Sequence, residues 1–189
     1  MTQHDREKWD RKYAEANLYQ DVSQVVLAYQ AYFPTSGSAL DVAGGAGRHA
    51  VWLAKRGMDV TIVDVSPVAL RQANCLAEES GVSLHSVCHD LDLGLPIGSW
   101  DLIFSNLFFD RRLFEEFQNA LTPGGRLVVI QPTQTNATRH AKPPEKFLPQ
   151  DNELPELVDG LNVILYETGW FQEGRFDAVL VAERPQVDS

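Results

Sequence analysis

A glycine-rich loop is the feature of this sequence with the clearest chemical use. Gly45, Gly47 and Ala50 match the G-x-G-x-x-G/A spacing, which lets the backbone approach a ligand closely where a strand turns into a helix. Asp64 lies 19 positions after Gly45, close to the separation of about 20 at which an acidic side chain binds a ribose hydroxyl. The loop therefore predicts a nucleotide-containing cofactor, and NAD is one candidate.

Asp41 helps to distinguish between cofactors of this kind. It lies at the end of a predicted strand, four residues before Gly45, so its carboxylate should lie close to a ligand bound on the loop. In a partly buried site a carboxylate repels a pyrophosphate, whereas it attracts the ammonium and sulfonium groups of S-adenosylmethionine. The charge of Asp41 therefore favours S-adenosylmethionine over NAD.

The elements that must position these residues alternate between strand and helix. Hydrophobic patterning and turn residues predict strands at residues 39–43, 59–65, 82–89, 100–105 and 125–131, with helices at 49–56, 67–79 and after 110. This rhythm predicts an α/β fold with a doubly wound, mostly parallel, Rossmann-like sheet, followed by a C-terminal antiparallel hairpin at 161–167 and 177–183. We expect one compact domain overall, with an N-terminal helical cap or lid at residues 1–35 and the main domain at 36–189.

Residues 40–50, Leu-Asp-Val-Ala-Gly-Gly-Ala-Gly-Arg-His-Ala, resemble motif I of class I S-adenosylmethionine-dependent methyltransferases, with Ala43 in place of the first glycine. Asp64 resembles the family's ribose-binding acid, and Asp90 resembles the acid that accepts a hydrogen bond from the adenine amino group. Residues 121–127 resemble the turn that opens the fifth strand. The resemblance implies a methyltransferase with S-adenosylmethionine as its cofactor. The cofactor-binding residues that we predict are Asp41, Ala43, Gly44, Gly45, Gly47, Arg48, Asp64, Val65, Ser66, Asp90, Leu91, Asn106, Trp9 and Tyr13.

A narrower resemblance is to the tellurite-resistance methyltransferase family. It rests on Gly47-Arg48-His49, on residues 147–154 and on the closing hairpin. Trp9 and Tyr13, spaced i and i+4 on a helix, resemble the aromatic lid segment of related enzymes. Ordinary packing of an amphipathic helix is the alternative for these two side chains.

The charge distribution bears on the methyl acceptor. A net charge of −10 disfavours nucleic acid as a partner, because such binding depends on Lys and Arg contacts to phosphates. Residues 127–144 nevertheless lack any acidic side chain and contain Arg139, His140 and Lys142. We predict a small-molecule acceptor that is anionic or a soft nucleophile, such as a thiol or an oxyanion of selenium or tellurium, with Arg139 and His140 as candidate catalytic residues. A solvated surface loop is the alternative interpretation.

Further expectations come from what the sequence lacks. The polar N-terminus and the absence of an apolar run of about 20 residues predict a cytoplasmic protein without a membrane span. The spacing of Cys75 and Cys88 gives no reason to expect a metal site. Two other functions stay open, a noncatalytic domain that binds S-adenosylmethionine for regulation and an NAD-dependent oxidoreductase. The sequence does not predict the oligomeric state.

Overall fold

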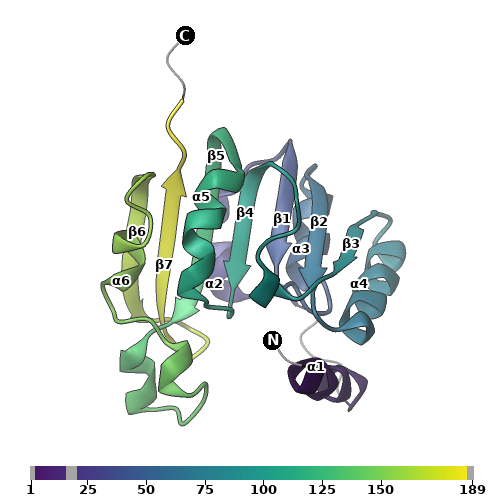
Figure 1. Cartoon of the computed structure of the whole chain (residues 1–189), viewed down its shortest axis with the longest axis horizontal. Helices are drawn as coiled ribbons and strands as arrows, with labels where there is room; N and C mark the ends of the chain where they lie inside the picture. The colour runs from purple at the N-terminus through teal and green to yellow at the C-terminus, as the bar shows by residue number, and fades with distance from the viewer. Residues whose placement is uncertain (1–2, 16–20, 187–189) are drawn as a thin grey trace.

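The computed structural model describes residues 3–15 and 21–186. Their strands form one seven-stranded sheet in the order β3-β2-β1-β4-β5-β7-β6 (Figure 1). Strands β1 to β5 pair in parallel, while β7 runs antiparallel to both β5 and β6. The predicted α/β fold with a C-terminal antiparallel hairpin is therefore confirmed. The strands are β1 (Ser38–Val42), β2 (Asp59–Asp64), β3 (His85–Cys88), β4 (Trp100–Asn106), β5 (Leu121–Pro132), β6 (Asn162–Trp170) and β7 (Phe176–Glu183).

Helices cover both faces of this sheet, and each face has its own apolar core. One core joins α2, α3 and α4 to the sheet through side chains such as Val25, Leu53 and Leu70. The other joins α5 and α6 to the opposite face through Phe114 and Leu154. The helices are α1 (Gln3–Glu15), α2 (Gln24–Ala28), α3 (Arg48–Lys55), α4 (Pro67–Glu79), α5 (Phe114–Ala120) and α6 (Glu153–Glu156), with 3-10 turns η1 (Gln30–Tyr32), η2 (Leu91–Leu93), η3 (Arg111–Leu113), η4 (Gln134–Thr138) and η5 (Glu145–Phe147).

Local sequence signals account for several boundaries. The Ser66 hydroxyl caps α4 by accepting the N–H of Ala69 at 3.1 Å, and Pro67 occupies the first helical position. Other boundaries differ from the prediction because tertiary pairing sets them. Strand β3 is shorter than predicted, since its pairing with β2 begins only at His85, and β6 extends to Trp170 because it pairs with β7 as far as Phe176.

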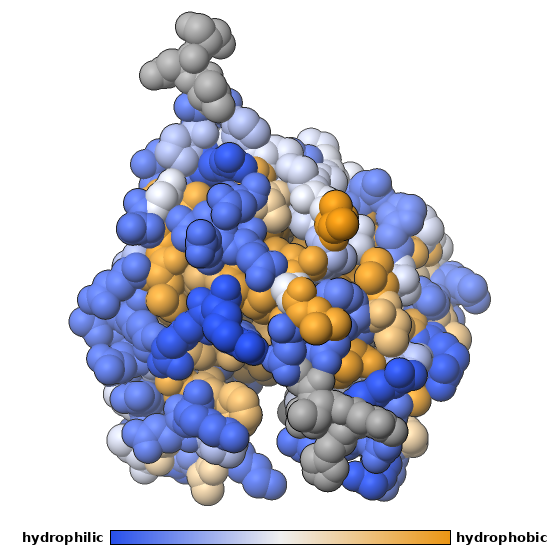
Figure 2. All heavy atoms as spheres, viewed as in Figure 1, coloured by the Kyte–Doolittle hydropathy of each residue, from blue (hydrophilic) through white to orange (hydrophobic). Residues whose placement is uncertain are grey.

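The carboxyl ends of the parallel strands lie along one edge of the sheet. Beyond this edge, α1 and the irregular segment 133–150 stand on opposite sides of a gap (Figure 1). Figure 2 shows that side chains leave a notch in the surface there, which we call the cleft. Ligands in doubly wound folds bind at this edge of the sheet. Among the helices in the described ranges, none has the length and apolar character that a membrane crossing requires.

Candidate active site

The glycine loop turns tightly between β1 and α3. The N–H of Gly47 donates to the carbonyl of Gly44 at 3.1 Å, and the N–H of Gly44 donates to Val63 of β2 at 3.1 Å. Gly45 and Gly47 adopt φ values of +59° and +83°, which other residues rarely adopt. A Cβ at Gly47 would lie 2.6 Å from the Cβ of Ala73 in α4. Only glycine therefore fits at position 47 without displacing α4.

Ala43, which replaces the first glycine of the motif, is also in the left-handed region, with φ +53°. A non-glycine residue in this conformation costs about 1–2 kcal/mol. The loop therefore begins with backbone strain, and strain of this kind concentrates at functional sites.

Asp41 lies beneath the loop and is almost fully buried, with 1% of its surface exposed. Its Oδ2 atom has no hydrogen-bond partner among the residues that the structure describes. Burial, reinforced by the charge of Asp64 and opposed by that of Arg48, raises the pKa of Asp41 to about 7. Because an unpaired buried carboxylate oxygen is costly, its position beside the loop suits a cationic group of a ligand.

Asp64 ends β2 and supports the glycine loop directly. Its Oδ2 accepts the N–H of Gly45 at 3.0 Å and its Oδ1 accepts the N–H of Ser66 at 2.8 Å. Burial raises the pKa of Asp64, although these backbone hydrogen bonds oppose the shift. A carboxylate offers about four acceptor positions, so Asp64 keeps the capacity to accept hydrogen bonds from ribose hydroxyls.

Helix α1 packs against α4 and is fastened over the loop. The Ser66 hydroxyl donates to Asp10 at 2.5 Å, and the side-chain amide of Gln72 donates to the carbonyl of Tyr13 at 2.7 Å. Burial and the charge of Asp64 raise the pKa of Tyr13. The rings of Trp9 and Tyr13 lie 6.0 Å apart. Asp10 could not be predicted as part of the site, because no local pattern connects it with Ser66, 56 positions away.

The other predicted cofactor residues lie at successive strand ends. Asp90 accepts the N–H of Asp92 at 3.0 Å and so caps the short turn η2, whose first residue, Leu91, is buried. Val65 is buried at the end of β2. Asn106 ends β4, and its Oδ1, like Oδ2 of Asp41, is buried without a partner in the described part of the chain. Neighbouring strands β1 and β4 therefore both present free acceptor oxygens at the carboxyl edge.

The candidate acceptor residues, Arg139 and His140, lie across the cleft from α1, and both contact the β6–β7 hairpin. The guanidinium carbon of Arg139 lies 3.9 Å from the ring centre of Trp170, and Nε2 of His140 lies 2.7 Å from the carbonyl oxygen of Gly174. These contacts hold segment 133–150 against the hairpin. Burial, together with the charges of Lys8 and Lys142, lowers the pKa of Lys12, so cations from α1 and from this segment lie near one another.

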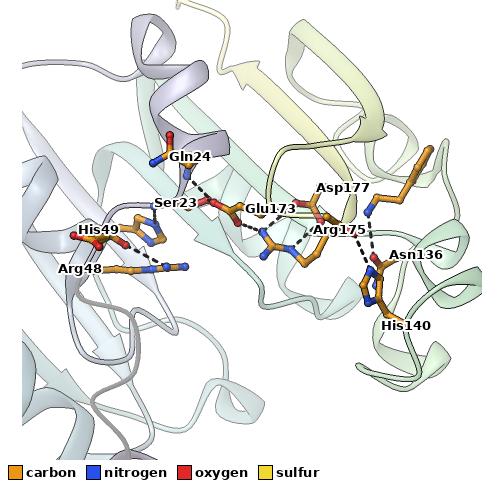
Figure 3. Close-up of polar contacts among 12 residues, drawn as sticks. Ser23, Gln24, Arg48, His49, Asn136, His140, Glu173, Arg175 and Asp177 are labelled. Carbon is orange, nitrogen blue, oxygen red and sulfur yellow. Dashed lines mark hydrogen bonds and ion pairs between the residues drawn. The ribbon is translucent and has the colours of Figure 1, made fainter.

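Arg48 and His49 are the first two residues of helix α3, directly after Gly47 (Figure 3). Arg48 donates to the carbonyl of Asp21 at 3.3 Å, and Nε2 of His49 accepts the N–H of Ser23 at 3.4 Å. Burial, with the charge of Arg48, lowers the pKa of His49 well below its ordinary value. His49 is therefore a neutral acceptor that ties α3 to residues 21–24, a segment that the sequence analysis did not single out.

The fold and the chemistry of the site together indicate the class of protein. The unpartnered oxygens of Asp41 and Asn106 beside the glycine loop are suited to bind a cationic group of a cofactor, and the acidic side chain at the end of β2 is suited to bind a ribose. Residues 39–125 match the family model described as "Methyltransferase domain". This segment is a methyltransferase domain, and S-adenosylmethionine is its cofactor, as the sequence predicted.

Two curated relatives are similar to parts of the chain. Ribosomal protein L11 methyltransferase of Thermus thermophilus is 32% identical over 130 residues, which cover 67% of this chain and 50% of that protein. Ribosomal RNA small subunit methyltransferase C of Chromohalobacter salexigens is 33% identical over 107 residues, covering 51% of this chain and 32% of that protein. The chain therefore spans half or less of the length of these relatives.

Solved structures share the fold over nearly the whole chain. TehB from Haemophilus influenzae superposes with a TM-score of 0.73 at 17% identity, covering 93% of this chain and 67% of that one. The N-methyltransferase NodS from Bradyrhizobium japonicum, in complex with S-adenosyl-L-homocysteine, gives a TM-score of 0.74 at 16% identity, covering 96% and 98%. At such low identities the likeness establishes the fold alone, and TehB is one of many structural neighbours.

Proposed function

We propose that this protein transfers a methyl group from S-adenosylmethionine to a small-molecule acceptor. The observation that carries the proposal is the buried, unpartnered Oδ2 of Asp41 beside the glycine loop. When bound, S-adenosylmethionine supplies an electrophilic methyl group on a sulfonium. The protein must then hold donor and acceptor aligned and exclude water.

The described residues divide this work among them. Asp41 and Asn106 offer acceptor oxygens to the ammonium group, Asp64 to the ribose and Asp90 to the adenine amino group. Helix α1 acts as the cap, in which Tyr13 covers the glycine loop and keeps water from it, whereas residues 24–33 pack in the core against the sheet. No dedicated base is required for a thiolate or an oxyanion, and His140 is the candidate base for an acceptor that needs one.

We further propose that the acceptor is anionic. A local positive field is required, because the net charge of −10 repels an approaching anion. Lys12 on α1 and Lys142 across the cleft supply such a field, and no carboxylate in the described ranges forms an ion pair with either. Arg139 adds a planar group that can hold two oxygens of one anion. Thiols that carry a carboxylate and oxyanions of selenium or tellurium meet these requirements.

A macromolecular acceptor is the second candidate. It is supported by the two curated relatives, whose names specify a ribosomal protein and a ribosomal RNA. The acidic character of the chain weighs against RNA, since phosphate contacts dominate that kind of binding. A basic ribosomal protein is the stronger form of this alternative.

A turnover screen separates these acceptors. Production of S-adenosylhomocysteine is measured with 3-mercaptopropionate, with its neutral analogue 3-mercaptopropanol, with selenite and tellurite, and with ribosomal protein L11 and ribosomal RNA. We expect the anionic thiol or an oxyanion to react at least about tenfold faster than the neutral analogue, in line with one charge-assisted hydrogen bond. Turnover of ribosomal protein or RNA alone would overturn the small-molecule proposal.

A further inference from the structure

The turn of the β6–β7 hairpin contacts both the start of α2 and segment 133–150 (Figure 3). On one side, Oε1 of Glu173 accepts both the hydroxyl of Ser23 and the backbone N–H of Gln24, each at 2.6 Å. On the other side, the carbonyl oxygen of Gly174 is hydrogen-bonded to Nε2 of His140 in segment 133–150. The hairpin turn therefore joins the N-terminal part of the chain to the candidate acceptor segment.

An ion-pair chain keeps Glu173 in this position. Arg175 lies 2.6 Å from Oε2 of Glu173 and 3.1 Å from Oδ2 of Asp177, which is fully buried in β7. Although burial opposes ionisation, the hydrogen bond from Ser23 and the charge of Arg175 lower the pKa of Glu173. Glu173 is therefore ionised and held at the start of α2.

Glu173 takes the place of a helix cap on α2. Ser23 occupies the N-cap position, but its side chain makes no capping hydrogen bond within the helix. The N–H of Gln24, the first helical residue, instead donates to Glu173, a residue 149 positions further along the chain. A carboxylate satisfies such an exposed helix N–H more strongly than a hydroxyl does. The start of α2 is thus fixed from the hairpin.

The fixed segment is the one that contacts the glycine-loop helix. Asp21 accepts a hydrogen bond from Arg48, and Ser23 donates one to His49. Arg48 and His49 lie in the first turn of α3, directly after Gly47. The ring of His49 is buried and packs edge-on to Phe104 of β4 at 5.4 Å. Displacement of residues 21–24 would therefore leave His49 without its backbone partner and release the start of α3.

We propose that Glu173 is a positioning residue for the cofactor site. Its carboxylate holds residues 21–24 against Arg48 and His49, and through them it fixes the helix that begins at the glycine loop. Glu173 acts without touching the cofactor. This inference rests on the proposed cofactor site, but it does not depend on the identity of the acceptor.

The test is the affinity of the full chain for S-adenosylhomocysteine, measured by calorimetry beside thermal unfolding. Glu173→Gln should weaken binding about tenfold or more, the scale of one lost charge-assisted hydrogen bond. Glu167→Gln is the matched control. Glu167 accepts the hydroxyl of Tyr29 and so also joins the hairpin to the end of α2, but within the described ranges it forms no hydrogen bond with residues 21–24. We expect this control to bind within about twofold of wild type, and the thermal unfolding of both variants shows whether weaker binding follows merely from lost stability.

Two results would overturn the inference. One is wild-type affinity in a folded Glu173→Gln variant, and the other is equal weakening in both variants, which would mean general destabilisation. If Glu173→Gln does not fold, Ser23→Ala takes its place, since it removes one of the two donors to Glu173 and should weaken binding about threefold. A wild-type chain that does not bind S-adenosylhomocysteine would defeat the cofactor assignment itself, a failure that is plainly different from a silent Glu173 variant.

Discussion

The hydroxyl of Tyr13 lies so close to the Cα of Gly45 that a Cβ at position 45 would overlap it. This contact joins a helix at the N-terminus to the loop on which the cofactor is expected to bind. Gly45 also has a φ of +59°. The absence of a side chain therefore permits both the left-handed turn and the close approach of the Tyr13 ring. The cap and the loop therefore share one surface.

Replacement of Gly45 by Ala should affect both features. The left-handed conformation would cost about 1 kcal/mol, and Tyr13 would have to move away from the loop. We expect Gly45→Ala to weaken binding of S-adenosylhomocysteine at least about tenfold. Gly169→Ala in β6 is the control, because a Cβ there meets no atom within 4 Å. Equal affinities of the two variants, measured by calorimetry, would remove Gly45 from the site.

Asp41 predicts a pH-dependent affinity. Burial and the charge of Asp64 raise its pKa to about 7, so the unliganded protein holds a proton there below that pH. A cationic group binds the ionised carboxylate, so the affinity for S-adenosylhomocysteine should fall by up to about tenfold for each pH unit below 7. Asp41→Asn should bind more weakly above pH 7 and lose this dependence. An unchanged pH profile in Asp41→Asn would contradict the role of this carboxylate.

The same group predicts an opposite effect on stability. The pKa of Asp41 in the folded state is raised above the ordinary value of 3.8. The protonated side chain therefore contributes fully to the free energy of unfolding below pH 3.8, and this contribution is lost as the pH rises to about 7. Asp41→Asn should therefore unfold at higher denaturant concentration than wild type at pH 8, with a smaller difference at pH 4. Wild-type stability that stays constant relative to Asp41→Asn from pH 4 to 8 would show that the carboxylate is not buried as described.

Asp64 is expected to contribute directly to ribose binding. Asp64→Ala should lose about 2–4 kcal/mol of cofactor affinity, since a hydrogen bond to a charged group contributes ~1.5–3 kcal/mol. Asp64 also accepts the N–H groups of Gly45 and Ser66, so Asp64→Asn, which keeps one acceptor oxygen, should lose less. Titration of both variants with S-adenosylhomocysteine measures the difference. Normal binding by Asp64→Ala would exclude Asp64 from the site.

Arg139 tests the anionic acceptor. Arg139→Ala should lower kcat/KM for an anionic acceptor, which corresponds to a loss of about 1.5–3 kcal/mol of transition-state stabilisation. It should leave the cofactor affinity nearly unchanged. The rate in wild type should also fall with added salt. Lys146→Ala is the control, because Lys146 belongs to the same segment and lies 4.8 Å over the ring of Phe147. Wild-type kinetics of Arg139→Ala on every active acceptor would return segment 133–150 to a purely structural role.

Local sequence patterns were sufficient to predict the glycine loop and its acids. A strand, a tight turn and a helix follow one another there within a few residues, so Asp41, Gly45 and Asp64 could be placed without tertiary information. Helix α4 was also predicted with its observed bounds, Pro67–Glu79, because Ser66 caps it. The mostly parallel sheet followed from the alternation of strands and helices, and the C-terminal hairpin followed from two successive strand patterns, whereas the strand order came only from the structure.

Contacts between distant segments could not be predicted in this way. Ser23 and Glu173 are 150 positions apart, and neither belongs to a periodic pattern that would link them. Arg139 and His140 were noticed for their charge, but their contacts with Trp170 and Gly174 depend on where the hairpin docks. Propensity and spacing describe neighbours along the chain, whereas these pairs form only because the fold places distant segments side by side.

Titration calorimetry shows directly whether the loop between β1 and α3 binds S-adenosylmethionine. The full chain is titrated at pH 8 with S-adenosylhomocysteine and, separately, with NAD, and the same titrations are repeated on Asp41→Asn. We predict binding of S-adenosylhomocysteine at least about tenfold tighter than that of NAD, because the Asp41 carboxylate attracts an ammonium group and repels a pyrophosphate, and we predict that Asp41→Asn narrows this difference. Comparable or tighter binding of NAD by the wild-type chain would contradict the assignment of S-adenosylmethionine as the cofactor.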